Sequence, residues 1–373
     1  MSSMEKYVSN VVKSVPPSGI RKFFDLASQM QEVISLGVGE PDFVTPWHIR
    51  EACFHALEKG YTMYTSNHGL IELREEIALY QKRKIGVCYS PEDEILITIG
   101  VSEAVDLVMR ALIEPGDEVL VPEPSFVCYA PGAMLAYGKA VPVQTFNHDQ
   151  YRLKPEELGK SITPRRKILI LAYPSNPTGA IMHEEDLTAL LDIIIKNDLI
   201  VITDEIYSEL TYNGSHVSIA SLPGMRDRTV LLNGFSKAFA MTGWRVGYAC
   251  GHSDIIDAMK KIHQYSIMCA SIMGQKAALE ALRNGEHEMK KMVDSYNYRR
   301  RIMLAGFDDI GMSCFEPKGA FYCFPSIRCT GMSSEEFCEK LLEEEKVAVV
   351  PGNAFGSCGE GFVRCCYAAS VSN

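Results

Sequence analysis

The 373-residue sequence lacks the features that mark membrane and secreted proteins. No apolar run approaches the roughly 20 residues that a membrane-spanning helix needs. The first residues, MSSMEKYVSNVVKSVPPSG, contain no apolar core of the kind found in a secretory leader. Hydrophobic residues make up 47% of the chain and charged residues 23%, as in soluble globular proteins. We therefore expect a cytoplasmic protein without a membrane partner.

The chain also has little positive charge and no paired-cysteine motif. Its formal net charge of −10 leaves no basic footprint for a nucleic acid or an anionic membrane. We therefore expect no nucleic-acid partner, and any anion must be held by a few aimed groups. The 12 cysteines are scattered without a CxxC pair, so we expect no metal site and reduced thiols.

What the sequence does contain is a series of short aliphatic runs that end in glycine, proline or polar residues. They lie at residues 94–100, 117–124, 140–146, 166–179, 198–207, 229–236 and 244–251. Their apolar continuity favours buried parallel strands over exposed, alternating ones. Helix-like stretches such as SEAVDLVMRALIEPGD and HEEDLTALLDIIIKND separate many of them. This alternation predicts an α/β fold with a mostly parallel sheet, which we place at residues 46–275.

The C-terminal part changes character. EALRNGEHEMKKMVDSYNYRRR predicts one long helix, and FYCFPSI, SSEEFCEKLLEEEK, VAVVPG and FVRCCYA follow it as alternating strand-like and helix-like segments. We expect a smaller α+β domain made of residues 276–373 together with residues 1–45. No internal repeat or low-complexity linker separates the two parts.

Polar side chains with chemical potential follow several of the predicted strands. Asp204 and Tyr207 end LIVITDEIY, Asn176 follows ILILAYPS, and Lys237 follows VLLNGFS. One such lysine is usually a solvated surface charge, and one such aspartate is often a helix cap. Together, however, these groups should converge, because ligands bind at the carboxyl ends of strands in an open parallel sheet. Arg245 lies beyond Lys237 in FSKAFAMTGWRVGY, where we expect Gly243 to let the chain turn.

This set of groups suits a phosphorylated aromatic aldehyde. A desolvated lysine can form a Schiff base, and an aspartate can keep a pyridine nitrogen protonated. The stretch ITIGVSEAV places a helix start near Ser102, where free N–H groups and Arg245 could neutralise a phosphate. The residues therefore predict pyridoxal phosphate as the cofactor.

With these motifs the sequence resembles the class I/II aminotransferases, which are fold-type I pyridoxal-phosphate enzymes, over nearly its full length. The matching stretches are SLGVGEPDF, YTMYTSNHGLIELREEI, TIGVSEAV, YPSNPTG, DEIYSELTY, FSKAFAMTGWRVGY, GAFYCFPS and VAVVPGNAFG. The motifs are most similar to those of bacterial aspartate/aromatic-type and N-acetyl-diaminopimelate aminotransferases. The resemblance implies a large, mostly parallel seven-stranded sheet domain, a smaller α+β domain and a homodimer.

The resemblance also assigns roles around the cofactor. Lys237 would be the Schiff-base lysine and the proton carrier, Asp204 would hold the pyridine nitrogen, and Tyr207 and Asn176 would bond the phenolic oxygen. Phe126 would stack on the ring. The phosphate would be held by the backbone around Val101, Ser102 and Glu103, by Ser236 and Arg245, and by Tyr64 of the partner subunit.

Further residues are implied for the substrate. Arg364 would clamp the α-carboxylate through two hydrogen bonds, flanked by Gly39 and Asn176. The substrate side chain would meet an apolar and aromatic wall formed by Ile20, Phe126, Tyr322 and Tyr64 of the partner subunit. This wall suits aromatic or long-chain amino donors, or an acylated diamino acid. Residues 263–275 contain no arginine for a second carboxylate, which weakens a narrow aspartate specificity.

Two departures from the family pattern stand out. Cys365 and Cys366 follow Arg364, where relatives usually carry serine or threonine two positions later, and we expect both to be small buried side chains. The sequence ends at Asn373, whereas family members generally continue through a C-terminal helix. Without that helix we expect exposed apolar surface and a less supported Arg364 strand.

The function predicted from the sequence is transamination by ping-pong chemistry, with 2-oxoglutarate as the expected amino acceptor. The same residues also serve a cysteine-S-conjugate (cystathionine) β-lyase, which would release pyruvate without an acceptor. A third alternative is a non-enzymatic, effector-sensing domain of a transcription regulator. That alternative needs an attached DNA-binding domain, for which this acidic chain has no room.

Overall fold

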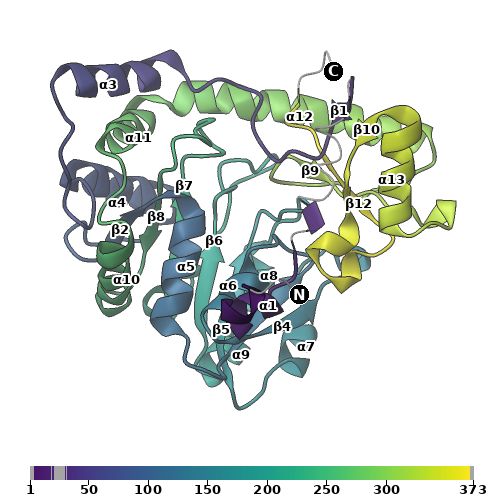
Figure 1. Ribbon diagram of the computed structural model, residues 1–373, viewed down its shortest axis with the longest axis horizontal. Coiled ribbons are helices and arrows are strands. Elements are labelled where there is room, and N and C mark those ends of the chain that lie inside the picture. The colour runs from purple at the N-terminus through teal and green to yellow at the C-terminus, as the bar shows by residue number, and fades with distance from the viewer. Residues whose placement is uncertain (1–3, 18, 21–29, 31, 370–373) are drawn as a thin grey trace.

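The computed structural model describes residues 4–17, 19–20, 30 and 32–369 (Figure 1). The strands are β1 (Ile34–Ser35), β2 (Ile95–Thr98), β3 (Glu118–Glu123), β4 (Lys139–Gln144), β5 (Arg166–Ala172), β6 (Ile200–Asp204), β7 (Thr229–Gly234), β8 (Gly247–Cys250), β9 (Tyr322–Cys323), β10 (Val347–Ala348), β11 (Val350–Pro351) and β12 (Val363–Cys366). The α-helices are α1 (Asn10–Ser14), α3 (Trp47–Glu58), α4 (Ile71–Ile85), α5 (Gly100–Leu112), α6 (Tyr129–Leu135), α7 (Pro155–Lys160), α8 (Glu184–Thr188), α9 (Leu191–Lys196), α10 (Ser253–Ser266), α11 (Ile272–Asn284), α12 (Glu286–Asp309) and α13 (Ser334–Glu345). Within the described residues, no helix is both long enough and apolar enough to cross a membrane.

Seven strands form one large sheet in the order β2-β8-β7-β6-β5-β3-β4. Each aliphatic run identified in the sequence overlaps one of these strands, so the mostly parallel α/β fold is confirmed. The direction of β8 differs from the prediction, because β8 is antiparallel to both β2 and β7. Parallel neighbours need a long crossover, usually a helix, whereas residues 235–246 return the chain from β7 to β8 without one.

Both faces of the large sheet are covered by helices. Successive strand residues point to opposite sides, so neighbours in one strand pack in different cores. Ile202 of β6 packs in one core with residues of α5, α6 and α10. Its neighbour Val201 packs in a second core with residues of α8 and α9, and a third core joins the sheet to α4 and α11. A sheet buried on both sides leaves the ends of its strands as the place where polar groups can gather.

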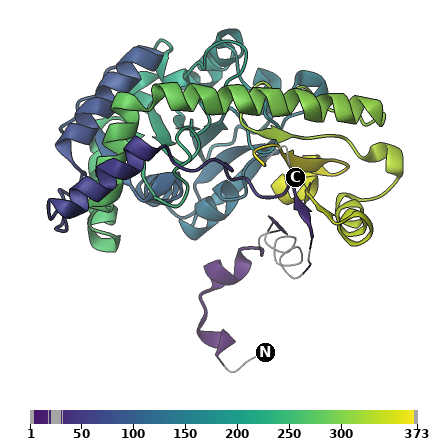
Figure 2. The same ribbon diagram turned by 90° about the horizontal axis from the view of Figure 1, so that it is seen from above.

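A small lobe adjoins the large sheet, formed by β1, β9 to β12 and α13 (Figure 1). In it, β12 lies between β11 and β9, and β1 pairs in parallel with β10. The N-terminal segment therefore packs on the C-terminal part of the chain. Figure 2 shows α12 running across the width of the molecule, from the large sheet to this lobe. The boundaries at residues 45/46 and 275/276 stay a prediction.

Two helices that the sequence presented as continuous are each divided. The helix predicted across residues 280–301 breaks at Gly285, between α11 and α12. A Cβ at Gly285 would lie 3.0 Å from the ring of Phe239, so the absent side chain lets the junction pack on the large lobe. The stretch at 183–198 forms α8 and α9, separated by a turn in which the Leu190 amide donates to the Leu187 carbonyl.

Candidate functional site

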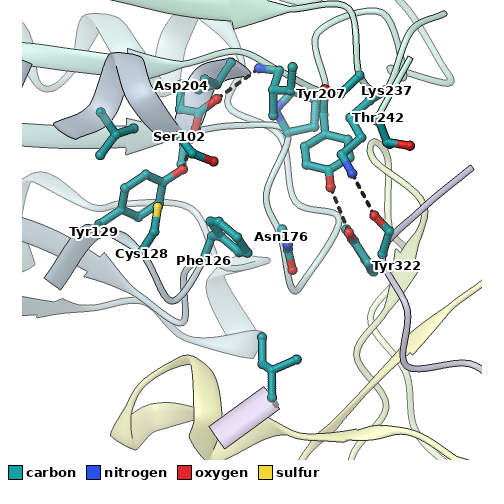
Figure 3. A pocket seen from close by; sticks show the side chains of 18 of the residues that line it. Ser102, Phe126, Cys128, Tyr129, Asn176, Asp204, Tyr207, Lys237, Thr242 and Tyr322 are labelled. Atoms are coloured by element: carbon teal, nitrogen blue, oxygen red, sulfur yellow. Dashed lines mark hydrogen bonds between the residues drawn. The ribbon is translucent and has the colours of Figure 1, made fainter. Parts of the chain in front are cut away.

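One pocket lies at the carboxyl ends of β5, β6 and β7 and encloses about 260 Å³ (Figure 3). Most of the residues predicted for the site line it: Ile20, Gly39, Val101, Ser102, Phe126, Asn176, Asp204, Tyr207, Ser236, Lys237, Arg245, Tyr322 and Arg364. Glu103 and Tyr64 are the predicted residues that do not. The structure thus brings the strand-end groups together, while the role of each group stays a prediction.

Lys237 reaches the pocket from the connection that follows β7. Its Nζ donates to the Gly39 carbonyl at 2.7 Å and lies 5.9 Å and 5.6 Å from the ring centroids of Tyr207 and Phe321. Burial lowers the pKa of this amine to about 8. At pH 7 such a lysine is neutral in roughly one molecule in ten, against roughly one in a few thousand for an ordinary lysine. Lys237 can therefore act as a nucleophile or a base near neutral pH.

Asp204 is the last residue of β6 and is 7% exposed. Tyr129 donates to its Oδ2 at 2.8 Å, and the Ile206 amide donates to Oδ1 at 3.1 Å (Figure 3). Burial raises the pKa of this carboxyl to about 6, and the two hydrogen bonds oppose that shift. With a pKa of about 6, the carboxyl is mostly ionised at neutral pH. A buried carboxylate of this kind can pair with a cation.

Tyr129 lines the pocket but is not among the residues predicted from the sequence. It is the first residue of α6, three residues beyond Phe126, and it is buried. No local sequence pattern marks it, because Phe126 lies before the helix and the partner of Tyr129 is on β6. The structure adds Tyr129 to the site as the hydrogen-bond donor of Asp204.

Replacing Tyr129 with phenylalanine should raise the pKa of Asp204. A hydrogen bond to a charged group contributes about 1.5–3 kcal/mol, which corresponds to roughly one to two pKa units. We expect kcat/KM to fall about tenfold and the acid limb of its pH profile to move upward by about one unit. Tyr248→Phe is the matched control, because it loses a buried hydrogen bond with Gln81 away from the pocket. An unshifted acid limb in Tyr129→Phe would contradict this role.

The end of the pocket that is predicted to hold a phosphate is built around the start of α5. Gly100 has a φ of 70°, and a Cβ there would overlap the guanidinium of Arg245. A Cβ at Gly247 would in turn overlap the backbone of Gly100 and Val101. These two glycines therefore let an arginine lie directly over the N-terminus of a helix, where free N–H groups and the helix dipole favour an anion.

Gly243 lies in a turn at residues 242–244, between Lys237 and Arg245 as expected, but its φ is not in the left-handed region. Left-handed backbone occurs at Ala240 and Arg245, with φ values of 51° and 53°. This conformation is costly for residues with a Cβ, and one long-range and one local hydrogen bond offset the cost. The Ala240 carbonyl accepts from the Thr45 hydroxyl at 2.6 Å, and Arg245 Nη1 donates to the Thr242 carbonyl at 3.0 Å.

Glu103 turns its carboxylate away from the pocket. Its Oε2 accepts from the Ile99 amide at 2.5 Å, and its Oε1 lies 2.7 Å from Nδ1 of the fully buried His263. The side chain thus caps its own helix and anchors it to α10. The predicted contact of Glu103 with a phosphate therefore concerns its backbone and not its side chain.

The opposite end of the pocket is formed by Arg364 on β12, which is 2% exposed. Its Nη1 donates to Asn176 Oδ1 at 2.8 Å and its Nη2 to the Gly37 carbonyl at 2.5 Å. The guanidinium carbon lies 4.5 Å and 4.9 Å from the ring centroids of Tyr322 and Phe355. Its buried Nε has no hydrogen-bond partner among the described residues. A buried arginine with an unused donor is suited to bind a carboxylate.

Tyr207 and Tyr322 form a hydroxyl pair beside this arginine, with their oxygens 2.7 Å apart (Figure 3). A Cβ at Gly39 would overlap the Tyr322 hydroxyl, so a glycine is required there. Ile20 is buried and belongs to the pocket wall, whereas Tyr64 is 79% exposed. Cys365 and Cys366 are buried as expected.

The chemistry of the pocket fits pyridoxal phosphate. The group needs an amine for its aldehyde, a carboxylate for its pyridine nitrogen, an anion site and an apolar ring face. Lys237, Asp204, the glycine-lined start of α5 and Phe126 supply these four features in one pocket. Arg364 serves none of these four needs, so it can bind the carboxylate of a second ligand.

Comparison with known proteins agrees with this geometry. The family profile described as "Aminotransferase class I and II" matches residues 31–373. The chain is 51% identical over 368 residues to "Putative aminotransferase YugH" of Bacillus subtilis (strain 168), covering 99% of this chain and 95% of that protein. It is 45% identical over 366 residues to an aspartate aminotransferase of Pyrococcus abyssi, with coverages of 97% and 94%. A solved aromatic aminotransferase from Pyrococcus horikoshii OT3 matches with a TM-score of 0.90 and 44% identity over 94% of each chain. This chain therefore belongs to the class I and II aminotransferases, enzymes that depend on pyridoxal phosphate.

Proposed function

We propose that this aminotransferase takes the amino group from an L-amino acid with an aromatic or long apolar side chain and passes it to 2-oxoglutarate by ping-pong chemistry. The observation that carries the proposal is the position of Lys237 and Arg364, which face one pocket with an apolar and aromatic wall. When bound, pyridoxal phosphate supplies an aldehyde for amines and an electron-withdrawing pyridine ring. The side chains of the pocket would bind and orient the reactants and move the protons.

Lys237 has two tasks in this proposal. Its amine would hold the cofactor's aldehyde covalently between turnovers, and during turnover it would take the proton from the substrate Cα and return one to the cofactor. The lowered pKa of about 8 supports both tasks, because each needs the neutral amine. Asp204 keeps the proton on the pyridine nitrogen, and Arg364 orients the substrate by its α-carboxylate.

The charges of the pocket support a donor without a second carboxylate. Its cationic lining residues, among those the structure describes, are Lys237, Arg245 and Arg364. The proposed roles use one of these cations for the aldehyde, one for the phosphate and one for the α-carboxylate. Ile20, Phe126 and Tyr322 then offer apolar surface to the side chain. The names of the relatives include both aspartate and aromatic aminotransferases. The choice between these two kinds of donor therefore rests on the charges and the apolar surface of the pocket.

A panel of amino donors with 2-oxoglutarate tests this proposal. We expect kcat/KM for phenylalanine, tyrosine and leucine to exceed that for aspartate by about tenfold or more, since the described residues give the pocket no further cation. An acylated diaminopimelate belongs in the same panel as a long-chain donor. Aspartate as the best donor would contradict the proposed specificity. Pyruvate release from cystathionine without an acceptor, at a rate above transamination, would favour the β-lyase alternative instead.

We also propose that a second copy of this chain completes the site. The large lobe exposes several large apolar and aromatic side chains: Trp47, Phe54, Met63, Tyr64 and Tyr265. Asn67 donates to the Met268 carbonyl at 2.8 Å, which joins the segment after α3 to the end of α10. Exposed apolar surface of this kind is typical of protein interfaces. In such a dimer, Tyr64 would reach the phosphate end of the partner's pocket.

Sedimentation of the purified protein should give twice the chain mass of 41.5 kDa. Tyr64→Phe should weaken binding of pyridoxal phosphate about tenfold, since a hydrogen bond to a charged group is lost. Tyr298→Phe, at an exposed position on α12, is the control and should leave the affinity unchanged. A monomer with full cofactor affinity would contradict the proposed dimer.

A further inference from the structure

A buried arginine outside the pocket ties two chain segments to α12. Arg299 is 9% exposed, and its Nη1 lies 2.8 Å from Asp42 Oδ1, 2.9 Å from the Ala368 carbonyl and 2.7 Å from the Ala369 carbonyl. The ring of Phe43 lies over the same guanidinium, 5.1 Å from its carbon. One side chain of the helix thus bonds to the segment before α3 and to the segment after β12.

These two segments carry the groups that face the α-carboxylate. Gly37 and Gly39 lie shortly before Asp42, and Arg364 lies shortly before Ala368. The segments also bond to each other, because the Cys366 amide donates to the Leu36 carbonyl at 2.7 Å and the Asp42 amide to the Ala368 carbonyl at 3.3 Å. Arg299 bonds to the far ends of both segments and does not line the pocket.

We propose that Arg299 is a positioning residue, which holds Arg364 in register with the Gly37 and Gly39 carbonyls so that an α-carboxylate is bound correctly. The inference rests on the proposed function, in which Arg364 binds the substrate carboxylate. Arg299 acts only through the two segments, because it touches none of the pocket atoms.

Three acceptors surround one nitrogen, Nη1, at the end of the long arginine side chain. A lysine keeps the positive charge, but its ammonium ends one atom short of the Nη1 position, so we expect it to hold the three acceptors less well. With the cation removed, the Ala368 carbonyl keeps only the Asp42 amide, and the Asp42 carboxylate loses its partner. We therefore expect the two segments to shift against each other, which changes the distance between Gly37 and Arg364.

Arg300 provides a matched control on the same helix. It is 4% exposed, and its Nη1 bonds to Glu316 at 2.7 Å and to the Pro317 carbonyl at 3.0 Å. Neither partner belongs to the segments held by Arg299. Loss of Arg300 should therefore cost stability of the fold without changing how a carboxylate is bound.

The test compares Arg299→Met, Arg299→Lys, Asp42→Asn and Arg300→Met in the protein loaded with pyridoxal phosphate. The first readout is the Kd of 3-phenylpropionate, an apolar carboxylate without the reacting amine, and the second is KM for donor and acceptor. A misplacement of about 1 Å can cost roughly a hundredfold, so we expect Kd and both KM values to rise ten- to a hundredfold in Arg299→Met. Arg299→Lys and Asp42→Asn should show smaller rises in the same direction. Affinity for pyridoxal phosphate should stay unchanged.

Wild-type Kd and KM values in folded Arg299→Met, or in Asp42→Asn if that variant does not fold, would overturn the inference. So would an equal rise in Arg300→Met, because a general loss of stability would then explain the effect. Failure of 3-phenylpropionate to bind the wild-type protein would also contradict it. If the wild-type protein transaminates no donor, the proposed function fails. The Kd of 3-phenylpropionate still shows whether Arg299 affects carboxylate binding.

Discussion

Lys237→Ala should abolish transamination, with kcat lowered at least about 10⁴-fold. The change removes the amine that we propose both as the covalent anchor of the cofactor and as the base for the substrate Cα proton. General acid–base catalysis alone contributes up to about 10⁴-fold, and loss of the anchor adds to it. The amine reaches the Gly39 carbonyl inside the pocket, and no other lysine lines that pocket among the described residues.

The control for this variant is Lys261→Ala, which removes an exposed lysine of α10 that pairs with Asp257. It should keep wild-type kcat, and both variants should unfold at similar temperatures, since the Lys237 side chain forms one hydrogen bond with the residues that the structure describes. Substantial turnover in Lys237→Ala would exclude the proposed role. Primary amines added to the solution should restore part of the proton transfer in that variant.

Asp204→Asn should lower kcat/KM by about 10²–10³-fold while leaving the fold intact. An asparagine keeps the shape of the side chain: its Oδ1 can accept from the Ile206 amide, and its Nδ2 can donate to the Tyr129 hydroxyl oxygen. It cannot carry the negative charge that would hold a proton on the pyridine nitrogen. Removing one aimed electrostatic group from a water-poor site typically has an effect of this size.

Glu205→Gln is the matched control for Asp204→Asn, because it neutralises the next residue in the chain. Glu205 is 1% exposed, and its carboxylate lies on the other side of the strand, where it accepts from Ser218 at 2.6 Å and lies 3.0 Å from His216. We expect Glu205→Gln to lower stability and to change kcat/KM much less than Asp204→Asn. Equal losses of kcat/KM would show that buried charge in general, and not the pairing of Asp204 with the cofactor, matters here.

Much of the site could be predicted because each strand, and the polar residues that follow it, form a pattern within one short stretch of sequence. Each strand is an apolar run, and each run ends where polar residues begin, so Asn176, Asp204 and Lys237 were found at the ends of β5, β6 and β7. Their convergence follows from the common direction of those three strands. The reversed direction of β8 was not visible, because its apolar pattern resembles that of a parallel strand.

Contacts between distant segments could not be predicted in this way. The hydrogen bond from Tyr129 to Asp204 joins α6 to β6, and Arg299 holds Asp42 from across the small lobe. Neither pairing has a local sequence pattern. Similarly, the left-handed backbone at Ala240 could not be predicted, because its carbonyl accepts from the distant Thr45.

Chemical trapping of the cofactor tests the central claim most directly. Sodium borohydride reduces the bond between the cofactor's aldehyde and the amine that holds it, so the modified residue can be identified by mass spectrometry of peptides. We expect a pyridoxyl group on the peptide that contains Lys237, with trapping that increases as the pH rises through about 8 because the neutral amine is required. A pyridoxyl group on another lysine, or none on Lys237, would contradict it.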